Sequence, residues 1–572
     1  MSGKLVILLS LTLVVAWTCC GCVTDESKDA SVKLRRQLPP YLAGTVSEYA
    51  VLADRPYLPV QGYGLVIGLG TDGASEVPAH VRDYLVEQLS RADIGSPQHG
   101  TGGVSPQRIL RDRDTAVVML AGAIPFGAPQ GTRFNLNAVA MSNTSTRSLD
   151  GGYLMPTELR FAWQGLATAG RGAKVFAEAT GPVFVNPYID PANSSEAIKL
   201  REGLILGGGR VTRERPVRLQ LIDPDFAMAQ TLRNRINERF RDRAPVADAK
   251  SRAIIELTVP RRWRQDHRHF LETVMHLPVL TAGAGWERRA KEIADQMEMP
   301  VADHNGLSLV LEATGRQATP LLREHYASAN PLAAFYAARA GLRLGDDLAG
   351  EVIIRFAGRP DSPVQIAAIE ELGRHPRVYQ AREILQGLLD DHNALVRVAA
   401  YEALVSRGDF SWIARTHVGQ AFVLDVVRCR ERPVIYATQD VSPRIVVFGE
   451  NVSVCRPIYF TTPNELVTLN ARQGDEKVTV YRKVPGTRAL SDSFLIDFDA
   501  RSLITTLGFR PEEDRNGKLK GLGLTYGQVV HVLQRMCESG HIQAKFILQR
   551  PPSLSRIYRG AGSVGRPNVS GE

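Results

Sequence analysis

The chain has 572 residues but few cysteines and only one long apolar run. That run, Leu5–Trp17, is too short to span a bilayer but has the length of the apolar core of a secretory signal. Since no later segment is apolar and long enough to cross a membrane, we expect a soluble body, held at a membrane only by its amino terminus. Beyond the leader only Cys429, Cys455 and Cys537 remain. They are too few and too scattered for a metal cluster, and the sequence leaves open whether one pair forms a disulfide.

A large excess of charge is also lacking, with 69 Lys and Arg against 60 Asp and Glu and a net charge of +9. This mild basic balance suits an anionic polymer such as cell-wall glycan or nucleic acid without requiring one. A surface slightly richer in arginine is the simpler interpretation, and we predict no nucleic-acid partner.

Patterns that carry catalysis are missing as well. Gly62, Gly64 and Gly68 have the spacing G-x-G-x-x-x-G without a following Lys-Ser/Thr pair, so a glycine-edged strand explains them better than a phosphate loop. Asp225 fits the N-cap of a helix better than a catalytic carboxylate paired with Asp223. We therefore predict no catalytic residue and no cofactor.

The segment PRRWRQDHRHF at residues 260–270 is the densest basic and aromatic cluster of the chain. Such a cluster could bind an anionic glycan or nucleic acid, and His267 and His269 could hold a metal. Because these two residues lack Cys or carboxylate partners at ligand spacing, we predict no metal site. We expect a solvated linker with a basic face.

The end of the leader resembles a bacterial lipoprotein signal. Gly21 and Cys22 follow the apolar run, and the resemblance implies that Cys22 becomes the lipid-bearing first residue of the mature protein. Such signals usually carry Leu where this chain has Cys19, which leaves Cys19 and Cys20 as rival cleavage sites and an ordinary cleaved signal as the alternative. Residues 23–40 are polar and end in two prolines, as expected of a tether.

The folded part begins with β structure, centred on residues 115–159. Apolar residues alternate with Asn135 and Asn137 over residues 134–140, which is the period of a half-buried strand. Residues 217–259 predict a strand, a helix capped by Asp225 and a second strand.

Between residues 281 and 410 the sequence becomes rich in Ala and Leu and predicts helices. The hexapeptides AARAGL, AAIEEL and AAYEAL begin at Ala337, Ala367 and Ala399, a spacing of 30 and 32 residues. They resemble HEAT repeats, which form an α-solenoid used as a protein-binding or spacing surface. After Trp412 strands return, and Thr525 with Gln528 predicts a capping box before a final helix.

Six pieces of the first region form an ordered series: QGYGLVIGLGTDG at 61–73, PFGAPQG at 125–131, SLDGGYLMPTEL at 148–159, FAEATGPV at 176–183, GGRVTRERPVRLQLIDPDFAMAQTLRNRINERF at 208–240 and AIIELTVP at 253–260. In this order they resemble the bacterial flagellar P-ring protein family. The likeness resumes with IVVFGENVSVCRPIYF at 445–460 and LTYGQVVHVLQRMCESGHIQAKFIL at 524–548. Since family sequence flanks the HEAT-like part, we interpret that part as an insertion.

The resemblance implies an α+β multidomain fold in which a β-rich and α/β P-ring-like core is interrupted by an all-α HEAT-like solenoid. The predicted domains are an export signal (1–22), a tether (23–40), a P-ring-like β-rich and α/β region (41–280), a HEAT-like insertion (281–410), a P-ring-like carboxy-terminal α/β region (411–550) and a disordered tail (551–572). The predicted signature and assembly positions are Gly62, Tyr63, Gly64, Gly68, Pro125, Phe126, Gly131, Ser148, Leu149, Gly151, Gly152, Asp225, Phe226 and Asn237.

The resemblance further implies a non-enzymatic subunit of a homo-oligomeric ring around the flagellar rod, in the periplasm at the level of peptidoglycan. Its expected partners are the rod, the outer-membrane ring proteins and peptidoglycan, with an outer-membrane lipid anchor if Cys22 is modified. The alternative is an envelope lipoprotein scaffold that binds a partner protein through its HEAT-like repeats.

Overall fold

A computed structural model describes residues 38–53, 57–91, 105–125, 127–161, 174–190, 193–214, 216–280, 284–462, 465–483, 490–511 and 521–550. The predicted export signal with Cys22, most of the tether, the tail and the signature residue Phe126 lie outside these described residues.

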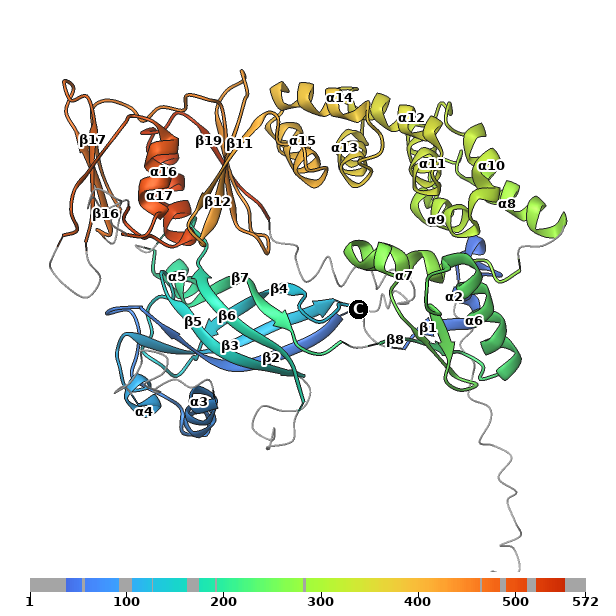
Figure 1. Ribbon diagram of the computed structural model, residues 1–572, viewed down its shortest axis with the longest axis horizontal. Helices are drawn as coiled ribbons and strands as arrows, with labels where there is room; N and C mark the ends of the chain where they lie inside the picture. Colours follow the sequence, from blue (N-terminus) through green and yellow to red (C-terminus); the bar gives the residue numbers. More distant parts are fainter. Residues whose placement is uncertain are drawn as a thin grey trace, which may run out of the picture. The chain divides into compact units, whose positions relative to one another are not determined.

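The first body is a closed barrel of six strands, in the order β2-β3-β4-β7-β6-β5 (Figure 1). The strands are β2 (Tyr57–Ile67), β3 (Thr115–Pro125), β4 (Arg133–Ala140), β5 (Tyr153–Phe161), β6 (Val175–Phe184) and β7 (Glu202–Val211). The predicted alternation is present in β4, where Phe134, Leu136, Ala138 and Ala140 are buried in the barrel core. Closure pairs β2 with β5, for example Gln61 with Arg160.

Short helices accompany the barrel. They are α3 (Ala79–Arg91), α4 (Pro106–Ile109), α5 (Ser194–Ala197) and the 3-10 turn η4 (Ile198–Arg201). The apolar residues Val81, Leu85 and Leu89 of α3 pack with Leu65 and Val117 in a cluster separate from the barrel core. Since Leu65 and Val117 belong to β2 and β3, α3 covers the outer surface of these two strands.

The second body is a small α/β unit with a four-stranded antiparallel sheet, in the order β1-β8-β10-β9. Its elements are η1 (Pro40–Leu42), α2 (Val46–Tyr49), β1 (Ala50–Leu52), β8 (Val217–Leu221), α6 (Phe226–Phe240), β9 (Ala247–Ala249), β10 (Ile254–Leu257), η5 (Arg261–Asp266) and α7 (His267–Met275). Asp225 caps α6 by accepting a hydrogen bond from the N–H of Met228, as its position predicts.

The segment at residues 260–270 departs from its prediction. It is not a solvated linker but forms η5 and the start of α7, with His269 and Phe270 buried. Phe270 packs edge-on against Phe240 of α6, with ring centroids 5.0 Å apart. Burial of this aromatic ring in a neighbouring core stabilises a helical structure here, although most of the surrounding residues are polar.

A run of helices follows, drawn from green to yellow-orange in Figure 1. They are α8 (Ala284–Gln296), α9 (His304–Thr314), η6 (Arg316–Ala318), α10 (Thr319–Glu324), α11 (Pro331–Leu344), α12 (Asp347–Ala357), α13 (Gln365–Arg374), α14 (Ala381–Gly387), η7 (Leu388–Asp390) and α15 (Ala394–Ser406). The three predicted Ala-rich repeats lie on α11, α13 and α15, which confirms a helical repeat. We call residues 284–406 the helical module.

The last body has two sheets with two helices between them (Figure 1). The five-stranded sheet holds β11 (Ile413–Val418), β12 (Phe422–Val427), β13 (Val434–Ala437), β14 (Arg444–Phe448) and β19 (Lys545–Leu548). The four-stranded sheet holds β15 (Ile458–Thr461), β16 (Val467–Ala471), β17 (Val478–Arg482) and β18 (Phe494–Ile496). Helices α16 (Ala500–Gly508) and α17 (Tyr526–Glu538) share one apolar core with both sheets, and the predicted capping box of α17 is present. The α+β multidomain fold class is thus confirmed.

Candidate functional site

The signature glycines of β2 lie where the barrel closes. A Cβ atom added to Gly62 would lie 2.6 Å from the carbonyl oxygen of Glu158, and one added to Gly64 would lie 2.7 Å from Cδ1 of Leu154. Both neighbours belong to β5, so the missing side chains let β2 and β5 approach each other. These glycines therefore allow the close pairing of β2 and β5, which agrees with the glycine-edged strand that the sequence predicts.

Other signature positions also have tasks within the barrel. Tyr63 packs against an aromatic ring of α3, with ring centroids 6.3 Å apart. Gly68 and Gly131 have φ values of +81° and +88°, which favour glycine. Pro125 is the last residue of β3, and the N–H of Gly131 donates a 2.8 Å hydrogen bond to the backbone of β7. This hydrogen bond holds the Pro/Gly corner after β3 against β7.

The signature loop at residues 148–152 lies between the barrel and α17. Ser148 accepts a 3.0 Å hydrogen bond from the N–H of Asp150 through its Oγ atom, and Leu149 is fully buried. Gly151 has a φ of +74°, and a Cβ added there would lie 2.6 Å from Nε2 of Gln528. The neighbouring Gly152 lies against apolar side chains of β2 and the turn after it. The contacts of this loop in the structure are thus within the subunit, and its role in assembly stays a prediction.

Of the signature positions on α6, one offers an exposed surface. Asn237 is used internally, since its side chain donates to the carbonyl of Ala247 and accepts from the N–H groups of Val246 and Ala247. Phe226, by contrast, is 64% exposed, and Ile222 four positions before it is 48% exposed. Phe226 is therefore the α6 signature position that is available for a protein contact.

The barrel and the carboxy-terminal body, on either side of the helical module, contact each other directly. Phe184 of β6 packs on Tyr526 of α17, with ring centroids 5.7 Å apart. Asn135 of β4 donates a 2.9 Å hydrogen bond to the carbonyl of Gln439, and its Oδ1 accepts from the N–H of Gly207. The segments before and after the helical module thus fold against each other, and the interpretation of the module as an insertion stays a prediction.

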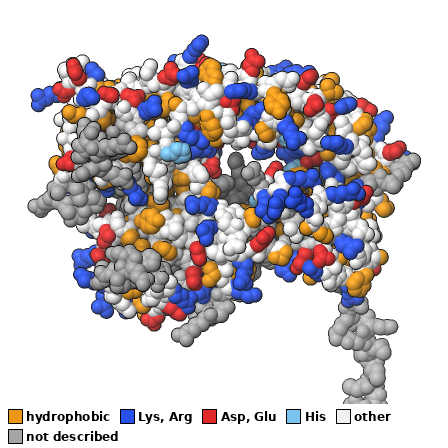
Figure 2. Space-filling model, viewed as in Figure 1, with side chains coloured by type: hydrophobic (Ala, Val, Ile, Leu, Met, Phe, Trp, Pro, Cys, Tyr) orange, Lys and Arg blue, Asp and Glu red, His pale blue; other side chains and the backbone are white. Residues whose placement is uncertain are grey.

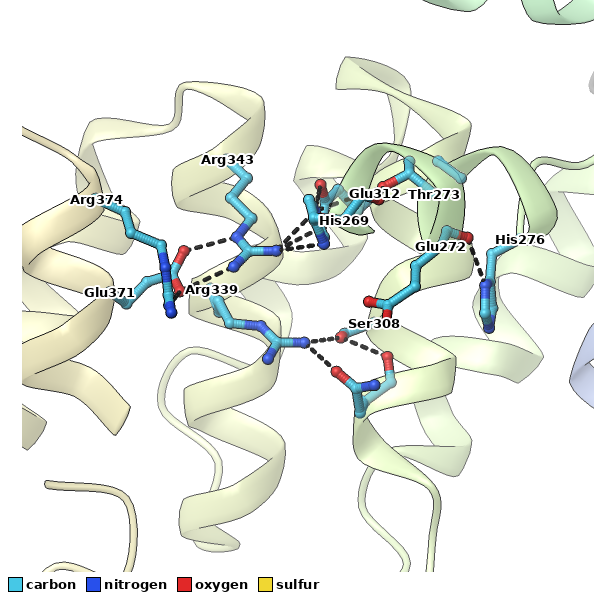
Figure 3. Close-up of polar contacts among 12 residues, drawn as sticks. His269, Glu272, Thr273, His276, Ser308, Glu312, Arg339, Arg343, Glu371 and Arg374 are labelled. Atoms are coloured by element: carbon cyan, nitrogen blue, oxygen red, sulfur yellow. Dashed lines mark hydrogen bonds and ion pairs between the residues drawn. The ribbon is translucent and has the colours of Figure 1, made fainter. Parts of the chain in front are cut away.

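A buried charged network joins the small α/β unit to the helical module (Figure 3). Nε2 of His269 on α7 lies 2.6 Å from Oε1 of Glu312 on α9. Arg343 on α11 contacts the His269 ring and donates 2.6 and 2.9 Å hydrogen bonds to the two carboxylate oxygens of Glu371 on α13. Glu312 and Glu371 are almost fully buried. We call His269, Glu312, Arg343 and Glu371 the junction network.

Charge pairing keeps Arg343 and Glu371 of this network ionised. Burial alone raises the pKa of Glu371, but the hydrogen bond from His375 and the charge of Arg343 outweigh it and hold that pKa well below its usual range. Burial likewise lowers the pKa of Arg343, but Glu371 and Glu312 outweigh it and raise that pKa. Both groups are thus charged at neutral pH, and each needs the other.

A second polar cluster fixes the far end of the helical module. The hydroxyl of Tyr401 on α15 donates a 2.6 Å hydrogen bond to Asp425 on β12, which also accepts two hydrogen bonds from Arg415. Arg444 on β14 pairs with Glu402 of α15 at 2.8 Å. The module is thus held by buried polar contacts at both ends.

The His, Cys, Asp and Glu side chains of the described residues are engaged in structural contacts or stand apart from one another. A search of those residues finds no group of three His, Cys, Asp or Glu that could hold a metal, and His269 is committed to the junction network. The thiols of Cys429, Cys455 and Cys537 are free, so the disulfide that the sequence left open is not formed. Within the same residues, no helix has the length and apolar character that a membrane span requires.

Comparison with known proteins agrees with these placements. The family model of the flagellar P-ring protein matches residues 52–285, and the model of HEAT repeats matches residues 349–414. The chain is 30% identical over 257 residues to the flagellar P-ring protein of Anaeromyxobacter sp. (strain K), covering 43% of this chain and 62% of the relative. It is 28% identical over 246 residues to the protein of the same name from Aquifex aeolicus (strain VF5), covering 41% of this chain and 62% of that relative.

A third relative aligns over a longer stretch. The flagellar P-ring protein of Geobacter sulfurreducens is 25% identical over 335 residues, which covers 55% of this chain and 83% of the relative. The chain thus spans less than two thirds of the first relatives but most of this one. The resemblance to the flagellar P-ring protein family that the sequence predicts is therefore confirmed over residues 52–285, and the predicted HEAT repeats are confirmed over residues 349–414.

Proposed function

We propose that this protein is a structural subunit of a ring around the flagellar rod in the cell envelope, and that it catalyses no reaction. The observation that carries the proposal is the match of residues 52–285 to flagellar P-ring proteins. The direct contact between the barrel and the carboxy-terminal body supports it, because the parts of the chain before and after the helical module pack together as one core would.

The barrel suits a mechanical role. All six strands are paired on both sides, so the barrel has no free edge, and its interior is filled by apolar side chains rather than open to a ligand. Identical subunits that contact each other head to tail form a closed ring when the rotation from each subunit to the next adds up to a full turn. We assign Phe226 and Ile222 to such a subunit contact. Phe226 is a predicted signature position with an exposed apolar side chain, and Ile222, four residues before it, is also exposed.

We further propose that the ring lies in the periplasm, in contact with peptidoglycan, and that a lipid on Cys22 anchors it to the outer membrane. The net charge of +9 supports a contact with anionic cell wall, although surface charge pairs weaken as salt rises. Mass spectrometry of the mature amino terminus tests the anchor. A diacylated Cys22 is the expected first residue, and an unmodified amino terminus at another position contradicts it.

The helical module adds a second layer of contacts, either to neighbouring subunits or to another envelope protein. Its alternative use is the capture of a partner by a lipoprotein scaffold that forms no ring. Isolation of flagellar basal bodies from the source cells separates the two proposals. A ring subunit remains with the rod after detergent extraction and is found by mass spectrometry of the purified basal bodies, whereas a free scaffold is absent from them.

A further inference from the structure

A polar pocket of about 290 Å³ lies beside the junction network. It is lined by residues of α7, α9, α11 and α13 or directly before α7, which makes it a feature of the contact between the small α/β unit and the helical module. Its charged lining residues are Arg268, Arg339, Arg343, Arg374, Asp266, Glu272, Glu370 and Glu371.

Three of the four arginines already have carboxylate partners. Arg268 pairs with Glu272 at 3.0 Å, Arg343 pairs with Glu371 at 2.6 Å, and Arg374 pairs with Glu371 at 3.2 Å. The longest of the ion pairs among the lining residues joins Arg374 to Glu370 at 3.9 Å. The remaining carboxylate, Asp266, is the residue before α7, where the positive end of the helix favours a negative charge.

Arg339 is the exception, since no carboxylate pairs with it within the described part of the chain. Its Nη2 atom donates to Oδ1 of Asn305 at 2.6 Å and to Oγ of Ser308 at 3.2 Å, both of which are neutral groups. Its Nε atom is buried and has no hydrogen-bond partner among the described residues. The guanidinium stacks 4.4 Å from the ring centre of Tyr336, which fixes its orientation.

Arg339 is half-buried, and a partly desolvated cation without a paired anion costs free energy that a bound anion would recover. Burial and the nearby charge of Arg343 lower the pKa of Arg339, and the opposing effects of Glu371, Tyr336 and Glu312 do not fully offset them. The planar guanidinium suits a carboxylate in particular, because its parallel N–H groups match two carboxylate oxygens.

The surface before α7 adds further positive charge. Arg261, Arg262 and Arg264 on η5 are exposed and directly precede the pocket residues Asp266 and Arg268. Figure 2 shows basic side chains gathered over the part of the molecule where Figure 1 places α7. This basic surface would attract an acidic segment toward the pocket.

We propose that the pocket between α7 and the helical module binds a carboxylate, held by Arg339. The carboxylate belongs either to an acidic segment of a partner protein or to a small free acid, and both present the same group to Arg339. An acidic segment would also contact the arginines of η5, whereas a small acid would not. Binding to this site can be measured on the unassembled full chain, so failure of the site and failure of ring assembly can be told apart.

Fluorescence anisotropy with the full-length protein tests the site, using a fluorescein-labelled Gly-Glu-Glu-Glu-Gly peptide as the probe and glutarate as the competitor. We expect saturable binding that glutarate displaces and that weakens as salt rises. Arg339→Gln should weaken binding about tenfold or more, as expected for loss of a charge-assisted hydrogen bond. Arg355→Gln is the matched control, because Arg355 is exposed on α12 and does not line the pocket.

A second pair of variants avoids any loss of native contacts. Ala367 lines the pocket and is exposed, so Ala367→Asp places a negative charge in the pocket, and Ala367→Asn is its neutral control of the same size. The aspartate should weaken binding at least several-fold more than the asparagine does. Equal affinities for these two variants, or wild-type affinity for Arg339→Gln, would overturn the site, as would the absence of binding at millimolar probe.

The same assay distinguishes the two sources of the carboxylate. Loss of the η5 charge in Arg264→Gln should weaken peptide binding and leave glutarate binding unchanged if a protein segment is the ligand. If both probes bind equally well to wild type and to Arg264→Gln, the site takes a small free acid. Either result supports the carboxylate site at Arg339.

Discussion

Nε2 of His269 lies 2.6 Å from Oε1 of Glu312, and this contact joins a helix of the P-ring-like segment to a helix of the helical module. Both side chains are buried, and Arg343 and Glu371 continue the network into the next helices. Together with Tyr401 and its partners at the other end, this network makes the helical module a fixed part of the subunit rather than a domain on a flexible linker.

Removal of Arg343 should destabilise the junction. Arg343→Leu leaves Glu371 buried without its main counter-charge, which we expect to cost about 3–5 kcal/mol. The loss should appear as a lower thermal midpoint and as faster amide hydrogen exchange in α11 and α13. The control Arg355→Leu, at an exposed position of α12, should change the midpoint little.

A double variant checks the physical reason for this loss. Arg343→Leu combined with Glu371→Leu removes both charges, and it should be more stable than Arg343→Leu alone because no unpaired carboxylate remains at position 371. A double variant that is less stable than the single variant would show that apolar packing, not charge pairing, dominates this position.

Stability should depend on pH through Asp150. Partial burial and the nearby charge of Asp72 raise the pKa of Asp150 to about 6, against an opposing hydrogen bond from the N–H of Gly151. A carboxyl group whose pKa is higher in the fold than in the unfolded chain stabilises the fold at low pH, and this contribution is lost as pH rises from about 4 to about 6.

Asp150→Asn should therefore be more stable than wild type at pH 7, by about 1 kcal/mol after allowance for partial exposure, and equal to it near pH 4. Urea unfolding at the two pH values measures the difference, with Asp295→Asn as the control at an exposed site of α8. A difference that is the same at both pH values would contradict a titrating Asp150.

Gly151 allows a comparison that separates backbone strain from contact. Gly151 and Gly44 both have a φ of +74°, but a Cβ on Gly44 would meet nothing within 4 Å, whereas one on Gly151 would press on Gln528. Gly44→Ala should cost about 1 kcal/mol of backbone strain. Gly151→Ala should cost about 0.5–2 kcal/mol more, because displacing Gln528 breaks the capping box of α17. Equal losses in thermal unfolding would show that Gln528 moves aside freely.

Phe226 should affect assembly more than folding. Because its side chain is 64% exposed, Phe226→Ser should leave the thermal midpoint nearly unchanged. If Phe226 lies in the subunit contact, the same change should shift sedimentation from large assemblies toward smaller species. Leu348→Ser is a matched control, since Leu348 is 50% exposed on α12 of the helical module. Unchanged assembly of Phe226→Ser would exclude Phe226 from the contact.

The three described thiols should differ in reactivity. Burial and the nearby charge of Glu538 raise the pKa of the Cys537 thiol to about 12, so very little of it is the reactive thiolate at neutral pH. Mass spectrometry after brief alkylation should find Cys537 less modified than Cys429 and Cys455. Equal labelling would contradict this order, and a disulfide-linked peptide would contradict the free thiols.

The sequence predicts local elements well where one pattern governs them. The strand, the helix capped by Asp225 and the second strand predicted over residues 217–259 are present as β8, α6 and β10, because alternation, helical spacing and capping act within a few residues. It does not predict that the barrel closes, because closure depends on the pairing of Gln61 with Arg160, about a hundred residues apart.

The junction network was not predicted for the same reason. His269 reads as a solvated residue in a basic stretch because its partners, Glu312 and Arg343, lie 43 and 74 residues further along the chain. One local signal was available, since Glu312 stands alone within the apolar helix His304–Thr314. A carboxylate in such a position needs a partner, and that requirement could have indicated the network.

Electron microscopy of the purified full-length protein in detergent is the most direct test of ring formation. A ring subunit should give closed particles of uniform diameter with many identical units, and rings should also form when the carboxylate pocket is altered by Arg339→Gln. Monomers or small open oligomers across the range of protein concentrations would contradict the ring and favour the lipoprotein scaffold.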